Sequence, residues 1–66
     1  MPIRVRELVH ILERDGWTLV AQKGSHRQFK HPVKPGKVTV PGSLSDELPI
    51  GTYKSILRQA ELEDQS

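Results

Sequence analysis

The feature that most constrains the fold of this chain is a Gly-Ser turn between two short stretches with the alternation of β-strands. Residues 17–23 alternate, so that one face of the strand carries Trp17, Leu19 and Ala21. Gly24-Ser25 supplies the turn, and residues 26–30 return with Phe29 as their one apolar side chain. We therefore expect an antiparallel hairpin whose apolar face must be covered by the rest of the chain.

Two amphipathic segments flank this hairpin and are predicted to be helices. Residues 3–15 have Val5, Leu8, Val9 and Leu12 at spacings of three and four. Asp15-Gly16 ends this helix, because glycine readily adopts the left-handed conformation. A second helix is expected to begin between Pro49 and Thr52. Its apolar stripe is Tyr53, Ile56, Leu57 and Ala60, with Ile50 one turn earlier.

The segments between the hairpin and the second helix complete the prediction. Residues 31–36 contain two prolines and a glycine, so they are irregular, and residues 37–40 form a third strand with Val38 and Val40 inward. Residues 41–49 are predicted to be a loop anchored by Leu44 and Leu48. The order α-β-β-β-α predicts an α+β fold, a three-stranded antiparallel sheet with both helices on one face.

The length of 66 residues limits the chain to a single domain, residues 1–66, near the lower end of what folds alone. No cysteine is present, which fits a reducing compartment. The polar, acidic residues 61–66 are expected to fray. No apolar run resembles a signal peptide or a membrane span, so we expect a cytoplasmic protein with no membrane partner.

Positive charge is concentrated in the middle of the chain. The formal net charge is only +2, but five cations and no acid lie between Gln22 and Val40. A local positive field of this kind suits phosphate, and therefore nucleic acid. A solvated basic surface explains the same charges equally well.

The sheet face opposite the helices is the candidate functional surface, called here the open face. Strand parity predicts that it displays the following side chains: Thr18, Gln22, His26, Gln28, Lys30, Lys37 and Thr39. Arg27 and Lys34 are expected at its rim. His31 has the opposite parity, which favours a packed or loop-pinning role over catalysis.

His26 is the candidate catalytic residue because a histidine titrates near neutral pH and can act as acid or base in RNA cleavage. Lys30, Arg27 and Lys37 would stabilise the charge on phosphorus. An exposed histidine beside a turn more often caps that turn through a hydrogen bond, and the residues alone favour this interpretation. The three histidines do not have metal-ligand spacing, so we expect no metal site and no cofactor.

Five motifs in order along the chain together resemble the HicA toxins, also called YcfA-like proteins. They are Gly16-Trp17, Gly24-Ser25-His26, Phe29-Lys30-His31-Pro32, Val38-Thr39-Val40-Pro41 and Pro49-Ile50-Gly51-Thr52 with Ser55-Ile56-Leu57-Arg58-Gln59-Ala60. The resemblance covers nearly the whole chain. Many relatives have glycine in place of Glu61, and some have a histidine where Ser43 or Leu44 stands.

The resemblance implies a double-stranded-RNA-binding-domain-like fold and the activity of an mRNA interferase, the toxin of a type II toxin–antitoxin system. It implies a HicB-type antitoxin as partner, mRNA as substrate and His26 as the catalytic residue. The residues that we expect to bind RNA around it are Gln22, Lys23, Ser25, Arg27, Gln28, Lys30 and Lys37.

Three classes of function remain compatible with the sequence. The first is an endoribonuclease that cleaves RNA through His26 without a metal ion. The second is a non-catalytic RNA-binding module, for which the basic open face suffices. The third is an interaction subunit whose basic face binds an acidic partner. RNA digestion separates the first two, and co-expression with the neighbouring reading frame tests the third.

Overall fold

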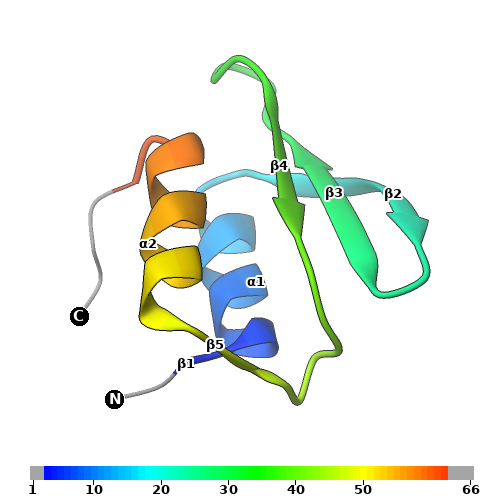
Figure 1. Cartoon of the computed structure of the whole chain (residues 1–66). Helices are drawn as coiled ribbons and strands as arrows, with labels where there is room; N and C mark the ends of the chain where they lie inside the picture. The colour runs from blue at the N-terminus through cyan, green and yellow to red at the C-terminus, as the bar shows by residue number, and fades with distance from the viewer. Residues whose placement is uncertain (1–2, 63–66) are drawn as a thin grey trace.

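The structure, a computed structural model, describes residues 3–62 (Figure 1). Two helices and five strands follow one another in the order β1 (Ile3–Arg4), α1 (Val5–Arg14), β2 (Thr18–Lys23), β3 (His26–Lys30), β4 (Lys37–Val40), β5 (Glu47–Leu48) and α2 (Ile50–Gln59). Both predicted helices and all three predicted main strands are present. Neither helix has the length and hydropathy needed to cross a membrane.

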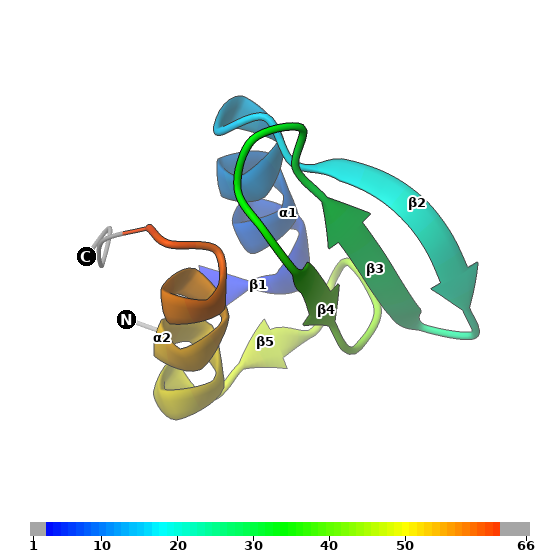
Figure 2. The same ribbon diagram turned by 90° about the horizontal axis from the view of Figure 1, so that it is seen from above.

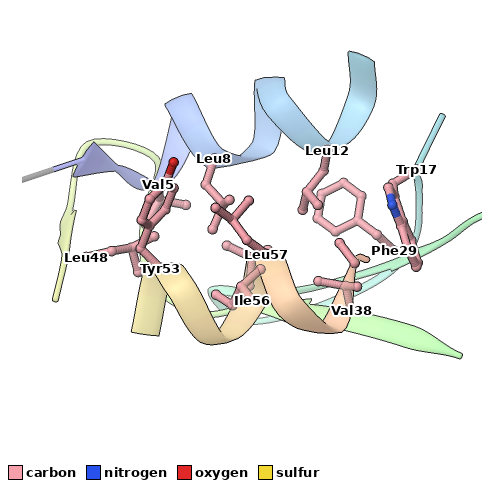
Figure 3. Close-up of a cluster of buried hydrophobic side chains, with 12 residues drawn as sticks. Val5, Leu8, Leu12, Trp17, Phe29, Val38, Leu48, Tyr53, Ile56 and Leu57 are labelled. Atoms are coloured by element: carbon pink, nitrogen blue, oxygen red, sulfur yellow. The ribbon is translucent and has the colours of Figure 1, made fainter. Parts of the chain in front are cut away.

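The main sheet is an antiparallel meander in the order β2-β3-β4. Phe29 pairs with Val38, and Lys30 pairs with Lys37, so Phe29 and the lysine pair lie on opposite faces. Both helices lie on one side of this sheet (Figure 2), and Phe29 points towards them in the core (Figure 3). The predicted α+β class is confirmed, and the arrangement is the double-stranded-RNA-binding-domain-like fold.

The core lies between the two helices and the helix-facing side of the sheet (Figure 3). Its buried members are Val5, Leu8, Leu12, Trp17, Phe29, Val38, Val40, Leu48, Tyr53, Ile56, Leu57 and Ala60. All four residues of the main apolar stripe predicted for the second helix are among them. Val38 and Val40 point inward as predicted, and Lys37 and Thr39 are exposed.

The start of α1 is held by backbone contacts that the sequence pattern does not predict. Ile3 pairs with Leu48 in a two-stranded sheet, where the pattern predicts a helix and a loop. The N–H groups of Val5 and Arg6 donate to the carbonyl oxygens of Asp46 (2.9 Å) and Leu44 (3.0 Å). These carbonyls satisfy two of the N–H groups that the first turn of a helix leaves unpaired.

The prediction that Leu44 anchors the 41–49 segment through its side chain is wrong, because that side chain is 45% exposed. Leu48 is buried, as predicted. The segment is instead fixed by main-chain bonds to α1 and by Asp46, whose carboxylate accepts a bond from the Ser43 N–H at 2.9 Å.

The strand β2 departs from simple alternation. Its pairing with β3 shifts between Leu19 and Ala21, which is the signature of a β-bulge. Leu19 pairs with Phe29 and therefore lies on the helix-facing side, as predicted, but it is 47% exposed. Ala21 pairs with Gln28, so its predicted helix-facing position is wrong, and all of β2 is exposed. β2 curves away from both helices (Figure 2), so neither helix covers it.

The end of α2 is more ordered than predicted. Glu61 adopts a positive φ of 56°, and its N–H donates to the Arg58 carbonyl. The Leu62 N–H donates to the Leu57 carbonyl at 2.8 Å, and Leu62 packs against the core. These two bonds form a Schellman motif, a common way for a helix to end. Residues 63–66 of the predicted frayed tail lie outside the described residues.

At the other end of α2, Ile50 is 55% exposed and does not extend the apolar stripe.

Candidate functional site

The open face carries His26 at one end and two paired lysines at the other. In an antiparallel pair, residues directly opposite each other point to the same side. The pairings His26–Lys23, Gln28–Thr39 and Lys30–Lys37 therefore define this face, and Thr18 joins it opposite Lys30. His26 and Lys30 are four positions apart along β3, which corresponds to about 13 Å.

Two of the residues predicted to bind RNA lie on the other side of the sheet. Gln22 pairs with Arg27, and Arg27 shares the face of Phe29. The open-face position predicted for Gln22 is wrong, because the bulge after Leu19 shifts the parity of the second half of β2. Lys23 takes the open-face position instead.

The side chains of Gln22 and Arg27 are bonded to nearby backbone. The Gln22 amide donates to the Gly24 carbonyl at 3.2 Å, within the hairpin turn. Arg27 donates to the carbonyl oxygens of Gly42 at 2.8 Å and Ser25 at 3.4 Å. Arg27 thus links the hairpin to the loop after β4.

His26 lines a groove of about 380 Å³ between the sheet and α2. On the sheet side the groove is lined by His26, Thr39 and Pro41. On the helix side it is lined by Gly51, Thr52, Ser55, Ile56 and Gln59. We call this the His26 groove. It forms because α2 packs beside β4, the edge strand that pairs with β3 (Figure 1).

The His26 ring makes no hydrogen bond or ion pair within residues 3–62. The sequence alone favours a turn-capping role for His26, and that role would require a hydrogen bond from the ring, which these residues do not show. No carboxylate lines the groove, so the ring has no acidic neighbour there to orient it. The imidazole is exposed and can take or give a proton at a molecule bound in the groove.

A second hollow of about 430 Å³ lies at the far end of the sheet. It is lined by Lys30, His31, Lys34, Pro35, Gly36 and Lys37. Lys30 and Lys37 are exposed and sit directly opposite each other on neighbouring strands. Like charges placed this way repel each other, so an anion between them would relieve the repulsion.

His31 has the pinning role predicted for it. Its Nε2 lies 2.7 Å from the Asp15 carbonyl oxygen, and its Nδ1 accepts the N–H groups of Val33 and Lys34 at 3.0 Å. This pattern requires the neutral ring with its proton on Nε2. The ring also packs edge-on against Trp17, with 5.2 Å between ring centroids.

Lys34 is a structural cation rather than a free cation at the rim. Its ammonium donates to the Asp15 carboxylate at 2.6 Å and to the carbonyl oxygens of Ala60 and Glu61 at 3.2 Å. The hydrogen bond from Lys34 lowers the pKa of Asp15, and the partial burial of the carboxyl opposes this shift. The cation lies at the C-terminus of α2, where the helix dipole favours positive charge.

Sequence reasoning missed the helix side of the groove. Thr52, Ser55 and Gln59 follow one another at spacings of three and four, so they form a polar stripe on one flank of α2. The spacing could be recognised in the sequence. The position of the stripe next to His26 could not be predicted, because it depends on the packing of α2 beside β4.

Within residues 3–62 no three histidine or acidic side chains come close enough together to hold a metal ion. The described part of the chain therefore presents two features as a candidate site: the neutral, polar groove around His26 and the lysine pair at the far end of the same face.

Comparison with known proteins identifies the family. A family model described as the HicA toxin of bacterial toxin–antitoxin systems matches residues 5–62. The match includes every element from α1 to α2 and both sides of the His26 groove. No curated protein matches the chain. Because the match spans most of the 66 residues, the chain belongs to the HicA toxin family, the toxins of bacterial toxin–antitoxin systems.

Proposed function

We propose that this toxin is an endoribonuclease, an mRNA interferase that cleaves RNA through His26. The observation that carries the proposal is the position of His26. The ring is exposed, has no intramolecular hydrogen bond within the described residues, and lies in a groove at one end of a cationic sheet face. Membership of a toxin family supplies the biological setting, since cleavage of transcripts slows growth.

The chemistry requires only the RNA and a proton carrier. The 2′-oxygen attacks the adjacent phosphorus, the bond from phosphorus to O5′ breaks, and a 2′,3′-cyclic phosphate forms. The 2′-hydroxyl loses its proton to a base, and O5′ gains one as it leaves. His26 carries out one of these transfers, because imidazole can do either near neutral pH.

We assign phosphate binding to the lysines of the open face. Lys30 and Lys37 are exposed at the end opposite His26, and Lys23 is paired with His26 itself. Contacts of this kind fix the position of a nucleic acid without reading its sequence. Ser25 and Gln28 lie beside them as neutral contacts. The bonds of Arg27 and Gln22 to backbone carbonyls support a structural role for these two residues.

A HicB-type antitoxin is the proposed protein partner. Its binding surface would cover the open face and carry acidic groups opposite Lys23, Lys30 and Lys37. Complementary charge of this kind speeds association and favours the correct partner.

One observation favours a second candidate, an RNA-binding module without catalysis. Among the residues that line the His26 groove, His26 is the one histidine, and no acidic side chain accompanies it. A ribonuclease with two histidines divides the acid and base roles between them, whereas the lining of this groove offers one histidine. We therefore expect slow cleavage.

Purified His26→Ala protein tests the proposal. We expect it to bind RNA but to lose cleavage and growth inhibition, with an unchanged circular dichroism spectrum. His10→Ala is the matched control, since His10 is exposed on α1, and it should cleave at the wild-type rate. A His26→Ala protein that degrades RNA as fast as wild type would refute the catalytic assignment.

A further inference from the structure

The helix side of the His26 groove has a chemistry that phosphate binding does not explain. Thr52, Ser55 and Gln59 line it without a charged neighbour. Lys30 and Lys37 lie at the other end of the open face, and Lys23, which pairs with His26, is not among the residues that line the groove. The lining of the groove therefore suits a neutral, polar ligand better than a phosphate.

The polar groups of this groove are free to bind. The side chains of Thr39, Thr52, Ser55 and Gln59 make no hydrogen bond within residues 3–62. The side chain of Gln22 differs from these, because its amide already donates a hydrogen bond to the hairpin turn. Hydroxyl and amide groups both donate and accept, as the edge of a nucleobase does.

The groove also has apolar surface for the face of a ring. Ile56 is 3% exposed and contributes to the lining from the core side, and Pro41 lies across from α2. The volume of about 380 Å³ is near the lower end of the range for small-molecule sites, roughly 300–1,000 Å³. A space of this size is sufficient for one nucleobase.

We propose that the His26 groove holds one unpaired nucleobase beside the scissile phosphate, and that Gln59, with Thr52 and Ser55, reads its hydrogen-bonding edge. This inference rests on the proposed ribonuclease function and adds its substrate class, which is single-stranded RNA. Thr52, Ser55 and Gln59 are then specificity-determining residues, while His26 acts on the backbone.

The chemistry independently requires an unpaired nucleotide. In a regular stacked helix the 2′-oxygen does not lie in line with the bond that must break, so the nucleotide has to leave the stack before attack. Base edges in a paired RNA helix are also hard to reach, because the major groove is deep and narrow. Enzymes that act at a base solve the same problem by taking it out of the stack.

Gln59 predicts which base is read. A glutamine amide donates to one atom and accepts from its neighbour, which matches the N6 and N7 pair of adenine. A carboxylate at the same position only accepts, which matches the N4 amino group of cytosine. Gln59→Glu should therefore move the preference from adenine towards cytosine, an effect that a merely structural role of Gln59 would not produce.

The experiment uses a set of short single-stranded RNAs that differ in one base on either side of the cleaved bond. We expect wild-type protein to prefer adenine at one of these positions by about tenfold or more. Gln59→Leu should reduce this preference below about threefold. Arg58→Leu is the control, because Arg58 is on the same helix but lines a different hollow, and it should keep the preference. The same RNA annealed to its complement should be cut at least about 100-fold more slowly.

A second readout separates this inference from the proposed function. The same set is made with a 2′-deoxy nucleotide at the cleaved position, so that binding is measured without cleavage. If no RNA is cleaved but binding shows a base preference that Gln59→Leu removes, the ribonuclease proposal fails and the groove assignment stands. If RNA is cleaved without a base preference, or with one that Gln59→Leu leaves intact, the groove assignment is wrong. Equal cutting of duplex and single strand overturns the unpaired substrate.

Discussion

The ammonium of Lys34 lies 2.6 Å from the carboxylate of Asp15, and this ion pair joins three segments of the chain. Asp15 follows α1, Lys34 belongs to the loop between β3 and β4, and the same ammonium donates to two carbonyls at the end of α2. The side chains are 23% and 28% exposed, so the pair is only partly screened by water. It holds together the elements that carry the lysine end of the open face.

The first prediction concerns the pH dependence of stability. Lys34 lowers the pKa of Asp15 in the folded protein, whereas the pKa of an Asp in an unfolded chain is about 3.9. The contribution to stability is therefore complete above about pH 4 and decreases as the pH falls through the lower folded pKa. Asp15→Asn should reduce the free energy of unfolding by about 1 kcal/mol at neutral pH, and the difference from wild type should shrink in acid.

Urea unfolding of both proteins from neutral pH into acid, down to about pH 2.5, measures this effect. Glu13→Gln is the matched control, because Glu13 is exposed on α1 and its side chain makes no ion pair within the described residues, and it should change the free energy of unfolding little. A difference between Asp15→Asn and wild type that stays constant into acid would show that the ion pair does not contribute.

The second prediction concerns the end of α2. Glu61 has a φ of 56°, a region that costs a residue with a side chain roughly 1–2 kcal/mol relative to glycine. The greater flexibility of glycine in the unfolded chain offsets part of this difference. Glu61→Gly should therefore raise the free energy of unfolding by up to about 1 kcal/mol, which corresponds to roughly 4–8 °C in melting temperature.

Thermal unfolding followed by circular dichroism checks this. Glu13→Gly makes the same substitution inside α1, where it should lower stability by about 1 kcal/mol. If both variants are destabilised equally, the left-handed conformation of Glu61 is not a source of strain.

The main elements of the fold were predictable because their patterns are local. The spacing of Leu8 and Leu12, the alternation of Val38 and Val40 and the proline-rich break after β3 each specify one element. The pairing of Ile3 with Leu48 was not predictable in this way. It is a two-residue pairing between distant segments, stabilised by backbone groups that carry no sequence signal.

The candidate site was only half predictable. Strand parity placed His26, Lys30 and Lys37 on one face, as observed. It failed for Gln22, because a bulge inserts one residue without a distinctive residue type and reverses the parity after it. The α2 side of the groove depends on how the helix packs against the sheet, and the identities of Ser55 and Gln59 do not specify this packing.

The third prediction concerns electrostatic binding by the open face. Lys30→Ala and Lys37→Ala should each weaken RNA binding for all sequences, because each lysine binds a phosphate and releases counterions. For a single strand, the slope of log affinity against log salt should fall by about 0.7 for each phosphate that is no longer neutralised. Fluorescence anisotropy over a salt series measures the slope. Arg14→Ala, on α1, should leave it unchanged, and an unchanged slope in the lysine variants would show that they do not touch the RNA.

The fourth prediction concerns inhibition by the antitoxin. A partner that covers the open face should protect His26 from chemical modification in the complex, as measured by mass spectrometry after treatment with diethyl pyrocarbonate. In the free toxin both His26 and His10 are exposed and should react. A complex that is inactive but leaves His26 fully reactive would mean that the antitoxin acts from a distance.

The last prediction is that cleavage needs no metal ion. A metal-dependent nuclease needs carboxylates or imidazoles that converge on the scissile phosphate. The groove around His26 is lined by hydroxyl, amide and apolar groups, with His26 itself as its one imidazole. The attacking group must then be the 2′-oxygen of the RNA, which leaves a 2′,3′-cyclic phosphate and a 5′-hydroxyl. Digestion in excess EDTA should proceed at the wild-type rate, and RNA with a 2′-deoxy nucleotide at the cleaved position should resist. Loss of activity in EDTA that added metal restores, together with 5′-phosphate ends, would overturn this mechanism even if His26 proved essential.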